Sequence, residues 1–364
     1  MSAIQPLLEH VIALNGSDLH VRDRCTPRVR RNGPLEEISG SAALDPHTLD
    51  AMLREIAPAG ALDEFERTGD SRFVISLNGQ WRVRVSLLKN HQGRSAVLRC
   101  IPNEIATLEQ LGLPPVLAQQ LQHRSGLVLI SGATGAGTTT TVAALLKSVN
   151  TSQRRRILTL EHPIEYMHTP IQSMFIQRDV APHHGEAGVA PHSGYDVVAM
   201  GPLHSKEKIV AALSAAEAGM LVIGTLHSHT VIKALEQLLN CFSSDMQPWI
   251  RTMLANTLRC LTAQTLVPRA DGAGRCVANE ILIATTGVTS AIREGYVSKL
   301  GTMIQSGGAD GMITLDDALA KRVEAGMINA ADAMQHAVDK SRFERMAAKP
   351  AQAAAAASAT PAKA

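Results

Sequence analysis

The stretch Leu127–Thr139 reads LVLISGATGAGTT, and it decides the fold of this chain. The opening LVLIS is an apolar run of the kind expected for a buried strand, and the residues after the glycines have a helical pattern. Glycine permits the tight turn that must join the two elements. A strand that enters a helix through such a turn directs backbone N–H groups at a bound anion, next to the positive end of the helix. The stretch therefore predicts an α/β protein with a phosphate-binding loop.

The glycine-rich turn follows the pattern G-x-x-x-x-G-K-[ST] with one change, because Thr138 stands in the lysine position. Lys147, the next lysine, lies about 13 Å further along the expected helix and cannot replace the missing charge. A purely structural strand-to-helix turn is the alternative interpretation of the loop taken alone. The predicted nucleotide-binding residues are Gly132, Ala133, Thr134, Gly135, Ala136, Gly137, Thr138, Thr139 and Thr140.

Downstream of the loop, short apolar runs alternate with helical stretches. The runs are 127–130, 157–160, 197–200 and 221–224, and the helical stretches include 139–149 and 206–218. Short buried strands separated by helices indicate a mostly parallel sheet with helices on both faces. We therefore expect one P-loop domain over residues 117–346.

Upstream of the loop, residues 1–100 have the pattern of a small α+β domain of PAS-like type. Asn78-Gly79 separates two strand-like runs, 72–77 and 81–87, and supplies the positive φ angles of a tight hairpin. The prolines of 101–116 predict a linker, since proline disfavours helix at the residue before it. Residues 347–364 are rich in alanine, with lysine, proline and serine, and are expected to be disordered.

Composition narrows the class of protein. Aromatic residues make up 3% of the 364 residues and the formal net charge is +2, which argues against nucleic acid as a partner. The 5 cysteines are scattered, which predicts free thiols in a reducing compartment and no disulfide or zinc framework. Neither a signal peptide nor an apolar run of about 18 residues is found, so the sequence predicts a cytoplasmic protein.

Several motifs in a fixed order give the chain a family resemblance. They are Gly16–His20 (GSDLH), Leu160–Tyr166 (LEHPIEY), Val197–Ser205 (VVAMGPLHS), Ala216–His227 (AEAGMLVIGTLH) and the C-terminal segments 271–275, 280–282 and 292–295. Together they resemble the PilT/PilU branch of the type II/IV secretion ATPases over nearly the whole chain. The resemblance implies a RecA-like P-loop domain that takes ATP or ADP with Mg²⁺. It further implies hexameric rings at the cytoplasmic face of the inner membrane that engage the pilus platform protein, in type IV pilus retraction and twitching motility.

The chain departs from that family at the positions that carry its chemistry. Pro202 stands where the family has the Walker B glutamate that activates the attacking water. His162 replaces the aspartate of the acidic box, and His204 and Ser205 replace the arginine and aspartate that follow the glutamate. Segment 185–194, an arginine-bearing helix in relatives, is here rich in glycine and a poor helix former.

Four groups of polar residues remain as site candidates. Glu161 and His227 are the candidate catalytic residues, although Glu161 alternatively just ends a strand. Thr139 either holds Mg²⁺ through its hydroxyl or caps the helix. The resemblance implies that Arg82, Arg84 and Arg99 reach a neighbouring subunit's nucleotide, with solvated strand residues as the alternative. The cluster of His183, His184 and His192 is better interpreted as part of a solvated loop than as a metal site.

These departures lead to three hypotheses. A general base contributes about 10²–10⁴-fold to a rate, and electrostatic stabilisation often contributes as much again, so their combined loss favours a hydrolysis-impaired pseudo-ATPase that binds nucleotide weakly. This subunit would occupy a place in a ring of its own kind or of other PilT-family ATPases, or regulate one. The second hypothesis is an active retraction motor in which Glu161 and Lys206 take over. The third is a nucleotide-independent scaffold for other pilus ATPases.

Overall fold

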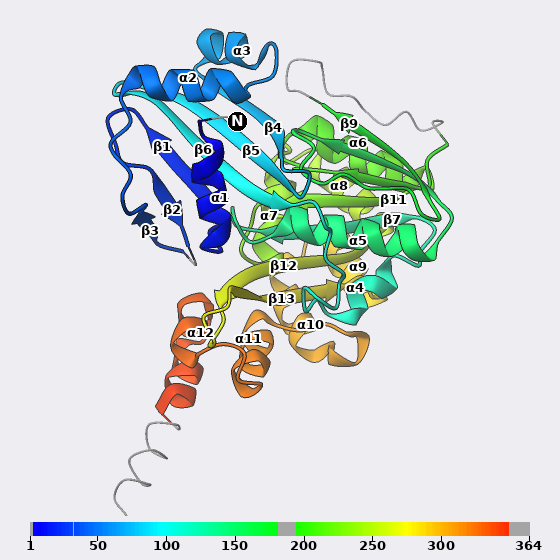
Figure 1. The fold of residues 1–364 in the computed structure, drawn as a ribbon. Helices are drawn as coiled ribbons and strands as arrows, with labels where there is room; N and C mark the ends of the chain where they lie inside the picture. The colour runs from blue at the N-terminus through cyan, green and yellow to red at the C-terminus, as the bar shows by residue number, and fades with distance from the viewer. Residues whose placement is uncertain (1–2, 32, 181–193, 349–364) are drawn as a thin grey trace, which may run out of the picture. The chain divides into compact units, whose positions relative to one another are not determined.

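The structure is a computed structural model, and it describes residues 3–31, 33–180 and 194–348 of the chain. These residues form two compact units (Figure 1). The first unit comprises the described parts of Met1–Ile105 and Arg178–His183, together with Glu161–Thr169. The second unit comprises Ala106–Leu160, Pro170–Gln177 and the described part of His184–Ala364. The first unit thus takes in a short segment from the middle of the chain.

A six-stranded antiparallel sheet forms the body of the first unit, in the order β3-β2-β1-β6-β5-β4. Its strands are β1 (Asp18–Arg22), β2 (Arg28–Arg30), β3 (Leu35–Glu37), β4 (Asp70–Leu77), β5 (Trp81–Asn90) and β6 (Gly93–Pro102). The hairpin expected at Asn78-Gly79 is confirmed: Leu77 pairs with Trp81, and the two turn residues have φ angles of 51° and 66°.

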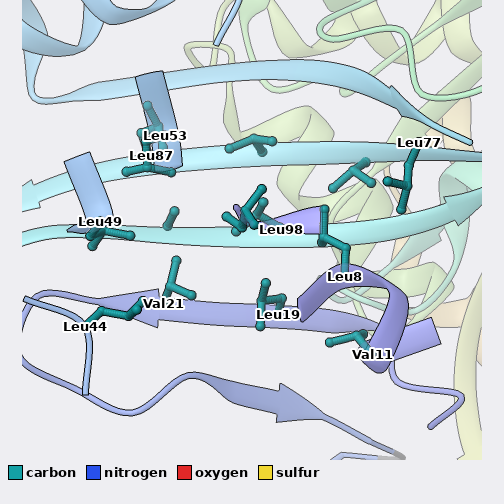
Figure 2. Packing of buried hydrophobic residues seen from close by; sticks show 14 of the residues in the cluster. Leu8, Val11, Leu19, Val21, Leu44, Leu49, Leu53, Leu77, Leu87 and Leu98 are labelled. Atoms are coloured by element: carbon teal, nitrogen blue, oxygen red, sulfur yellow. The ribbon is translucent and has the colours of Figure 1, made fainter. Parts of the chain in front are cut away.

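Three helices accompany this sheet: α1 (Gln5–Ala13), α2 (Pro46–Ile56) and α3 (Ala61–Thr68). The apolar residues of α1 and α2 recur at helical spacing, and Figure 2 shows them over the strands. The buried cluster that the figure draws includes Leu8 and Val11 of α1, Leu49 and Leu53 of α2, and Leu19, Val21, Leu77, Leu87 and Leu98 of the strands. Each such side chain contributes roughly 1.5–3 kcal/mol by its burial.

The second unit is built on a seven-stranded sheet in the order β13-β12-β7-β11-β10-β8-β9. Its strands are β7 (Gly126–Gly132), β8 (Arg156–Glu161), β9 (Met174–Asp179), β10 (Val197–Met200), β11 (Leu221–Leu226), β12 (Leu258–Pro268) and β13 (Arg275–Ile283). The pairs β12–β7, β7–β11, β11–β10 and β10–β8 are parallel, whereas β12–β13 is antiparallel. The expected strand at each apolar run and the mostly parallel sheet are confirmed.

Helices connect these strands and extend the second unit after β13. They are α4 (Pro115–Gln120), α5 (Thr138–Ser152), α6 (Lys206–Glu217), α7 (Val231–Asn240), α8 (Gln247–Thr257), α9 (Thr286–Glu294), α10 (Leu300–Ser306), α11 (Leu315–Glu324) and α12 (Ala330–His336), with short 3-10 turns at Val297–Lys299 and Gly308–Asp310. Beyond α10, Ile313 exchanges backbone hydrogen bonds of 2.9 and 3.3 Å with Ile281 of β13. Residues 340–348 are helical, and Phe343 within them is fully buried.

Part of what the sequence predicts lies outside the described residues: the histidines 183, 184 and 192, most of the glycine-rich segment 185–194, and the tail from 349 onward. Among the residues that the structure does describe, no helix combines the length and apolar character that a membrane crossing would require.

Candidate nucleotide site

Three loops of the second unit follow neighbouring strands of the parallel sheet. The phosphate loop follows β7, His227 follows β11, and Pro202 follows β10. The register places β11 between β7 and β10, with all three strands parallel. Because the carboxyl ends of parallel strands lie at one edge, the three loops gather there, where ligands bind in open α/β sheets.

The phosphate loop keeps the backbone shape that a phosphate requires. Gly135 and Gly137 each have a φ of 84°, in the left-handed region that favours glycine. A Cβ atom at Gly132 would lie 2.8 Å from Cβ of Ala136 and 3.0 Å from the carbonyl oxygen of Gln264, so this position also excludes a side chain. Helix α5 begins at Thr138, directly after the loop, and presents its N-terminal N–H groups. The backbone therefore fits a phosphate group.

Two side chains from the distant strands β12 and β13 contact this loop. The Nε2 amide of Gln264 donates to the carbonyl oxygen of Ala136 at 2.6 Å, and its Oε1 accepts from the Thr141 hydroxyl at 3.0 Å. An Nη1 group of Arg275 donates to the carbonyl oxygen of Gly135 at 3.2 Å. The sequence analysis gave neither residue a role: Gln264 lies outside the motifs, and Arg275 ends segment 271–275, in which nothing local points to the loop.

A reciprocal pair of hydrogen bonds joins the end of β7 to the loop after β11. The Ser131 hydroxyl donates to the carbonyl oxygen of Ser228 at 2.9 Å and accepts from the Ser228 N–H at 3.0 Å. The backbone next to His227 is thereby held beside the phosphate loop, while the His227 side chain is exposed. In the same way, the N–H of Leu203 donates to the carbonyl oxygen of Thr225 at 2.9 Å and holds the Pro202 loop against β11.

The backbone of this site fits a phosphate, but its three loops lack charged side chains. The three loop sequences 132–139, 201–205 and 226–229 contain no lysine, arginine or carboxylate. His204 directs Nδ1 to the carbonyl oxygen of Pro202 at 2.9 Å, and no acid or base stands at 202 itself. Within the residues that the structure describes, no three His, Cys, Asp or Glu side chains gather as a metal site would require. The loops fit a phosphate but do not supply the charges that outer phosphates and Mg²⁺ need.

Thr139, the candidate magnesium ligand, is the second residue of α5. The N-cap position of this helix is occupied by Gly137, so the interpretation of Thr139 as a capping residue is wrong. Thr138 is half-buried at the first helical position, where the usual motif has its lysine.

The acidic box packs within the first unit. Its Glu161 is the last residue of β8, in agreement with the interpretation that this residue ends a strand. The buried Glu165 forms an ion pair with the half-buried Arg84, and an Nη2 group of Arg82 donates to the carbonyl oxygen of Ile164 at 2.9 Å. Burial lowers the pKa of Arg82, with the charge of Glu161 opposing that shift. His162 lies with Nδ1 2.7 Å from Oδ1 of Asp179.

The third candidate arginine, Arg99, is also engaged within the first unit. Its Nε donates to Oδ1 of the buried Asp18 at 2.7 Å. Burial would raise the pKa of Asp18, but the hydrogen bond and charge of Arg99, with help from Ser17, hold it below its ordinary value. All three arginines expected to serve a neighbouring subunit therefore contact groups of their own chain.

A parallel sheet whose first strand enters a helix through a glycine-rich phosphate loop defines a P-loop α/β protein with a RecA-like second unit. The chain belongs to the type II/IV secretion system protein family, whose model matches residues 1–360.

Two relatives to which the chain is similar are type IV pilus ATPases. The chain is 33% identical to the type IV pilus retraction ATPase PilT of Pseudomonas aeruginosa over 340 residues, which cover 92% of this chain and 98% of PilT. It is 32% identical to the type IV pilus ATPase PilU of the same organism, with 92% and 88% covered. The crystal structure of the pilus retraction motor PilT with bound ADP superimposes with a TM-score of 0.78 at 28% identity, covering 94% of this chain and 99% of that one. The predicted family and fold are confirmed.

Proposed function

We propose that this chain is a hydrolysis-impaired subunit or regulator of a PilT-type retraction motor. The observation that carries the proposal is a phosphate loop with intact backbone geometry in which Thr138 and Pro202 occupy the two charged positions of the motif. The framework that binds a phosphate persists, while the groups that would hold and activate it do not. Weak binding of ATP or ADP without appreciable turnover follows from this combination.

The size of the missing catalytic contributions favours a loss of ATP hydrolysis over slow hydrolysis. A general base contributes about 10²–10⁴-fold to a rate, and electrostatic contacts to the transferred phosphoryl group contribute comparably. Glu161, the candidate catalytic acid, is followed by a segment that packs within the first unit around Arg82 and Arg84. An active motor that relies on Glu161 and Lys206 is therefore the weaker candidate.

The test is steady-state ATP hydrolysis with magnesium. We expect the unmodified chain to match a control in which Gly132 and Gly137 are both substituted by alanine, which destroys the loop. The double variant Thr138→Lys/Pro202→Glu should hydrolyse ATP above that baseline. A rate for the unmodified chain within tenfold of an intact PilT-type ATPase would show that it is a working motor.

Assembly with motor subunits is the second part of the proposal. PilT and PilU are type IV pilus ATPases, and we infer that this chain joins a hexameric ring with itself or with an intact PilT-type subunit at the cytoplasmic face of the inner membrane, against the pilus platform protein. Arg82, Arg84 and Arg99 would exchange their contacts within the chain for a neighbour's phosphates. Native mass spectrometry of a mixture with an intact PilT-type ATPase tests this.

Two results would each contradict one part of the assembly proposal. Absence of mixed species would end the hetero-ring idea. Mixed species in which Arg82→Ala and Arg84→Ala leave the partner's ATPase rate unchanged would leave only a scaffold role, and calorimetry without detectable nucleotide binding would point to the same conclusion.

A further inference from the structure

The amino-terminal ends of the parallel strands in the second unit lie at the sheet edge opposite the nucleotide loops. Segment 121–125 leads into β7, and segment 150–156 runs from the end of α5 into β8. Together these two segments contain 4 arginines and no aspartate or glutamate. Positive charge is therefore concentrated at this amino edge of the sheet.

Two large apolar residues of the neighbouring segment 170–174 are exposed. Ile171 and Met174 are 63% and 61% exposed, and of the large apolar residues that the structure describes only Val338 is more exposed. Single apolar side chains are ordinary on a protein surface, whereas apolar side chains grouped beside positive charge mark an interaction surface.

Hydrogen bonds hold this apolar segment against the arginine segment. The N–H of Met174 donates to the carbonyl oxygen of Arg155 at 2.9 Å, and the N–H of Arg155 donates to the Ser173 hydroxyl at 3.1 Å. Oδ1 of the buried Asn150, near the end of α5, accepts from the N–H of Ile171 at 2.9 Å. The exposed apolar side chains are therefore fixed directly beside the arginines.

The side chain of Arg155 connects the two arginine segments. Its Nη1 group donates to the carbonyl oxygen of His123 at 3.0 Å, next to Arg124. Burial lowers the pKa of Arg155, the charge of Asp196 opposes that shift, and the charge of Arg124 adds to it, so the two guanidinium groups lie near each other. Arg124 and Arg154 are exposed, and neither forms an ion pair with any other described residue. Both remain open to an anionic ligand.

The combination of charge and apolar surface determines the chemistry of the partner. Guanidinium groups pair with phosphate in bidentate geometry. The aliphatic side chain of Ile171 and the thioether side chain of Met174 need an apolar phase next to those phosphates, and a phospholipid bilayer supplies both. An acidic polypeptide would neutralise the arginines, but acidic segments carry few apolar groups with which to cover Ile171 and Met174.

We propose that the amino-edge patch, which comprises Arg124, Arg154, Arg155, Ile171 and Met174, binds the surface of an anionic phospholipid bilayer. The arginines contact the lipid phosphates, and the two apolar side chains insert at the boundary between headgroups and acyl chains. The patch lies at the opposite edge of the sheet from the nucleotide loops, so this binding does not depend on ATP hydrolysis. It attaches the chain to a membrane without a partner protein.

The test is cosedimentation of the full chain with lipid vesicles. We expect saturable binding to vesicles of phosphatidylglycerol mixed with phosphatidylcholine, and little binding to vesicles of phosphatidylcholine alone. Binding to the mixed vesicles should fall as the salt concentration rises, because salt screens the arginines. Equal binding to the two kinds of vesicle, or binding to neither, overturns the proposal.

Variants separate the two kinds of contact. Arg124→Gln and Arg154→Gln should each weaken binding about fivefold, the effect expected of one basic residue near an anionic surface. Ile171→Ser should weaken binding about tenfold, because insertion of an apolar side chain is lost. Arg345→Gln and Met246→Ser change exposed residues of the second unit outside the patch and should bind like the unmodified chain. Equal losses in the patch variants and these controls contradict the assignment.

Polyglutamate distinguishes a bilayer from an acidic polypeptide as the partner. Its binding is measured by calorimetry with the unmodified chain and with Ile171→Ser. We expect polyglutamate to bind more weakly than the mixed vesicles and to be insensitive to Ile171→Ser. Tighter binding of polyglutamate, together with normal vesicle binding by Ile171→Ser, assigns the patch to an acidic polypeptide and overturns the membrane proposal.

Discussion

The side-chain amide of Gln264 and the carbonyl oxygen of Ala136 are joined by a 2.6 Å hydrogen bond, although they come from β12 and the phosphate loop. Gln264 is 2% exposed, so water cannot readily replace this contact. The same amide also accepts from Thr141 in the first turns of α5. Two hydrogen bonds from the sheet therefore help to hold the loop in its binding shape.

Replacement of Gln264 tests that arrangement. Gln264→Leu removes both hydrogen bonds and leaves the Ala136 carbonyl and the Thr141 hydroxyl buried without their partner. We expect the free energy of unfolding to fall by about 1–3 kcal/mol, measured by urea denaturation. Gln305→Leu on the exposed side of α10 is the matched control, and an equal loss in the two variants would contradict the role given to Gln264.

A lysine at position 138 should restore nucleotide affinity. The missing charge-assisted contact is worth about 1.5–3 kcal/mol, so Thr138→Lys is expected to bind ATP about 10–150-fold more tightly than the unmodified chain, by calorimetry. Thr140→Lys adds the same charge two residues further into α5 and should give little gain. Sub-micromolar ATP binding by the unmodified chain would show that the lysine is not needed.

A carboxylate at position 202 should restore part of the chemistry only after the lysine is in place. In the Thr138→Lys background, Pro202→Glu is expected to raise the hydrolysis rate by up to about 10²–10⁴-fold, the range for a general base. Glutamine has nearly the same shape as glutamate but cannot take the proton, so Pro202→Gln should hydrolyse ATP no faster than Thr138→Lys alone. Equal rates for the two variants would mean that position 202 acts through backbone conformation alone.

Acid should weaken the first unit through His168. Burial lowers the pKa of His168 to about 4, from an ordinary value near 6.5. Between these values the unfolded chain binds the proton and the folded chain does not, so the free energy of unfolding falls as pH decreases from about 6.5 to 4. The full effect is on the order of 3 kcal/mol.

Fluorescence of Trp81 in a Trp249→Phe background reports unfolding of the first unit alone. In that background, His168→Gln should show a shallower loss of stability between pH 6.5 and pH 4, whereas His10→Gln, at an exposed site, should keep the slope of the parent. An unchanged slope in His168→Gln would assign the acid sensitivity to other groups.

Local signals in the sequence were sufficient for the elements and for the loop. The β4–β5 turn follows from Asn78 and Gly79, and the phosphate loop follows from glycines that need positive φ angles. Contacts between residues far apart in the chain were not predictable in this way. Gln264, Arg275 and the Ser131–Ser228 pair meet the loops only because the strand order brings them there.

The acidic box illustrates the same limit. Its motif was recognisable, but nothing local shows that Glu165 pairs with Arg84, a residue on an earlier strand of the first unit. The nucleotide-binding residues, the Thr139 metal role and the arginine roles stay predictions, since they concern a bound nucleotide or a second subunit.

The hydrogen bonds between Ile281 and Ile313 have a consequence for the solubility of the chain. Strand β13 is the last strand of its sheet among the described residues, and an open strand edge can template the same edge of another molecule. By occupying that edge at Ile281, the segment after α10 blocks the approach of a second strand. If Ile313→Pro displaced this segment, the edge of β13 would be exposed, and edge-to-edge pairing between molecules could lead to fibrous aggregation.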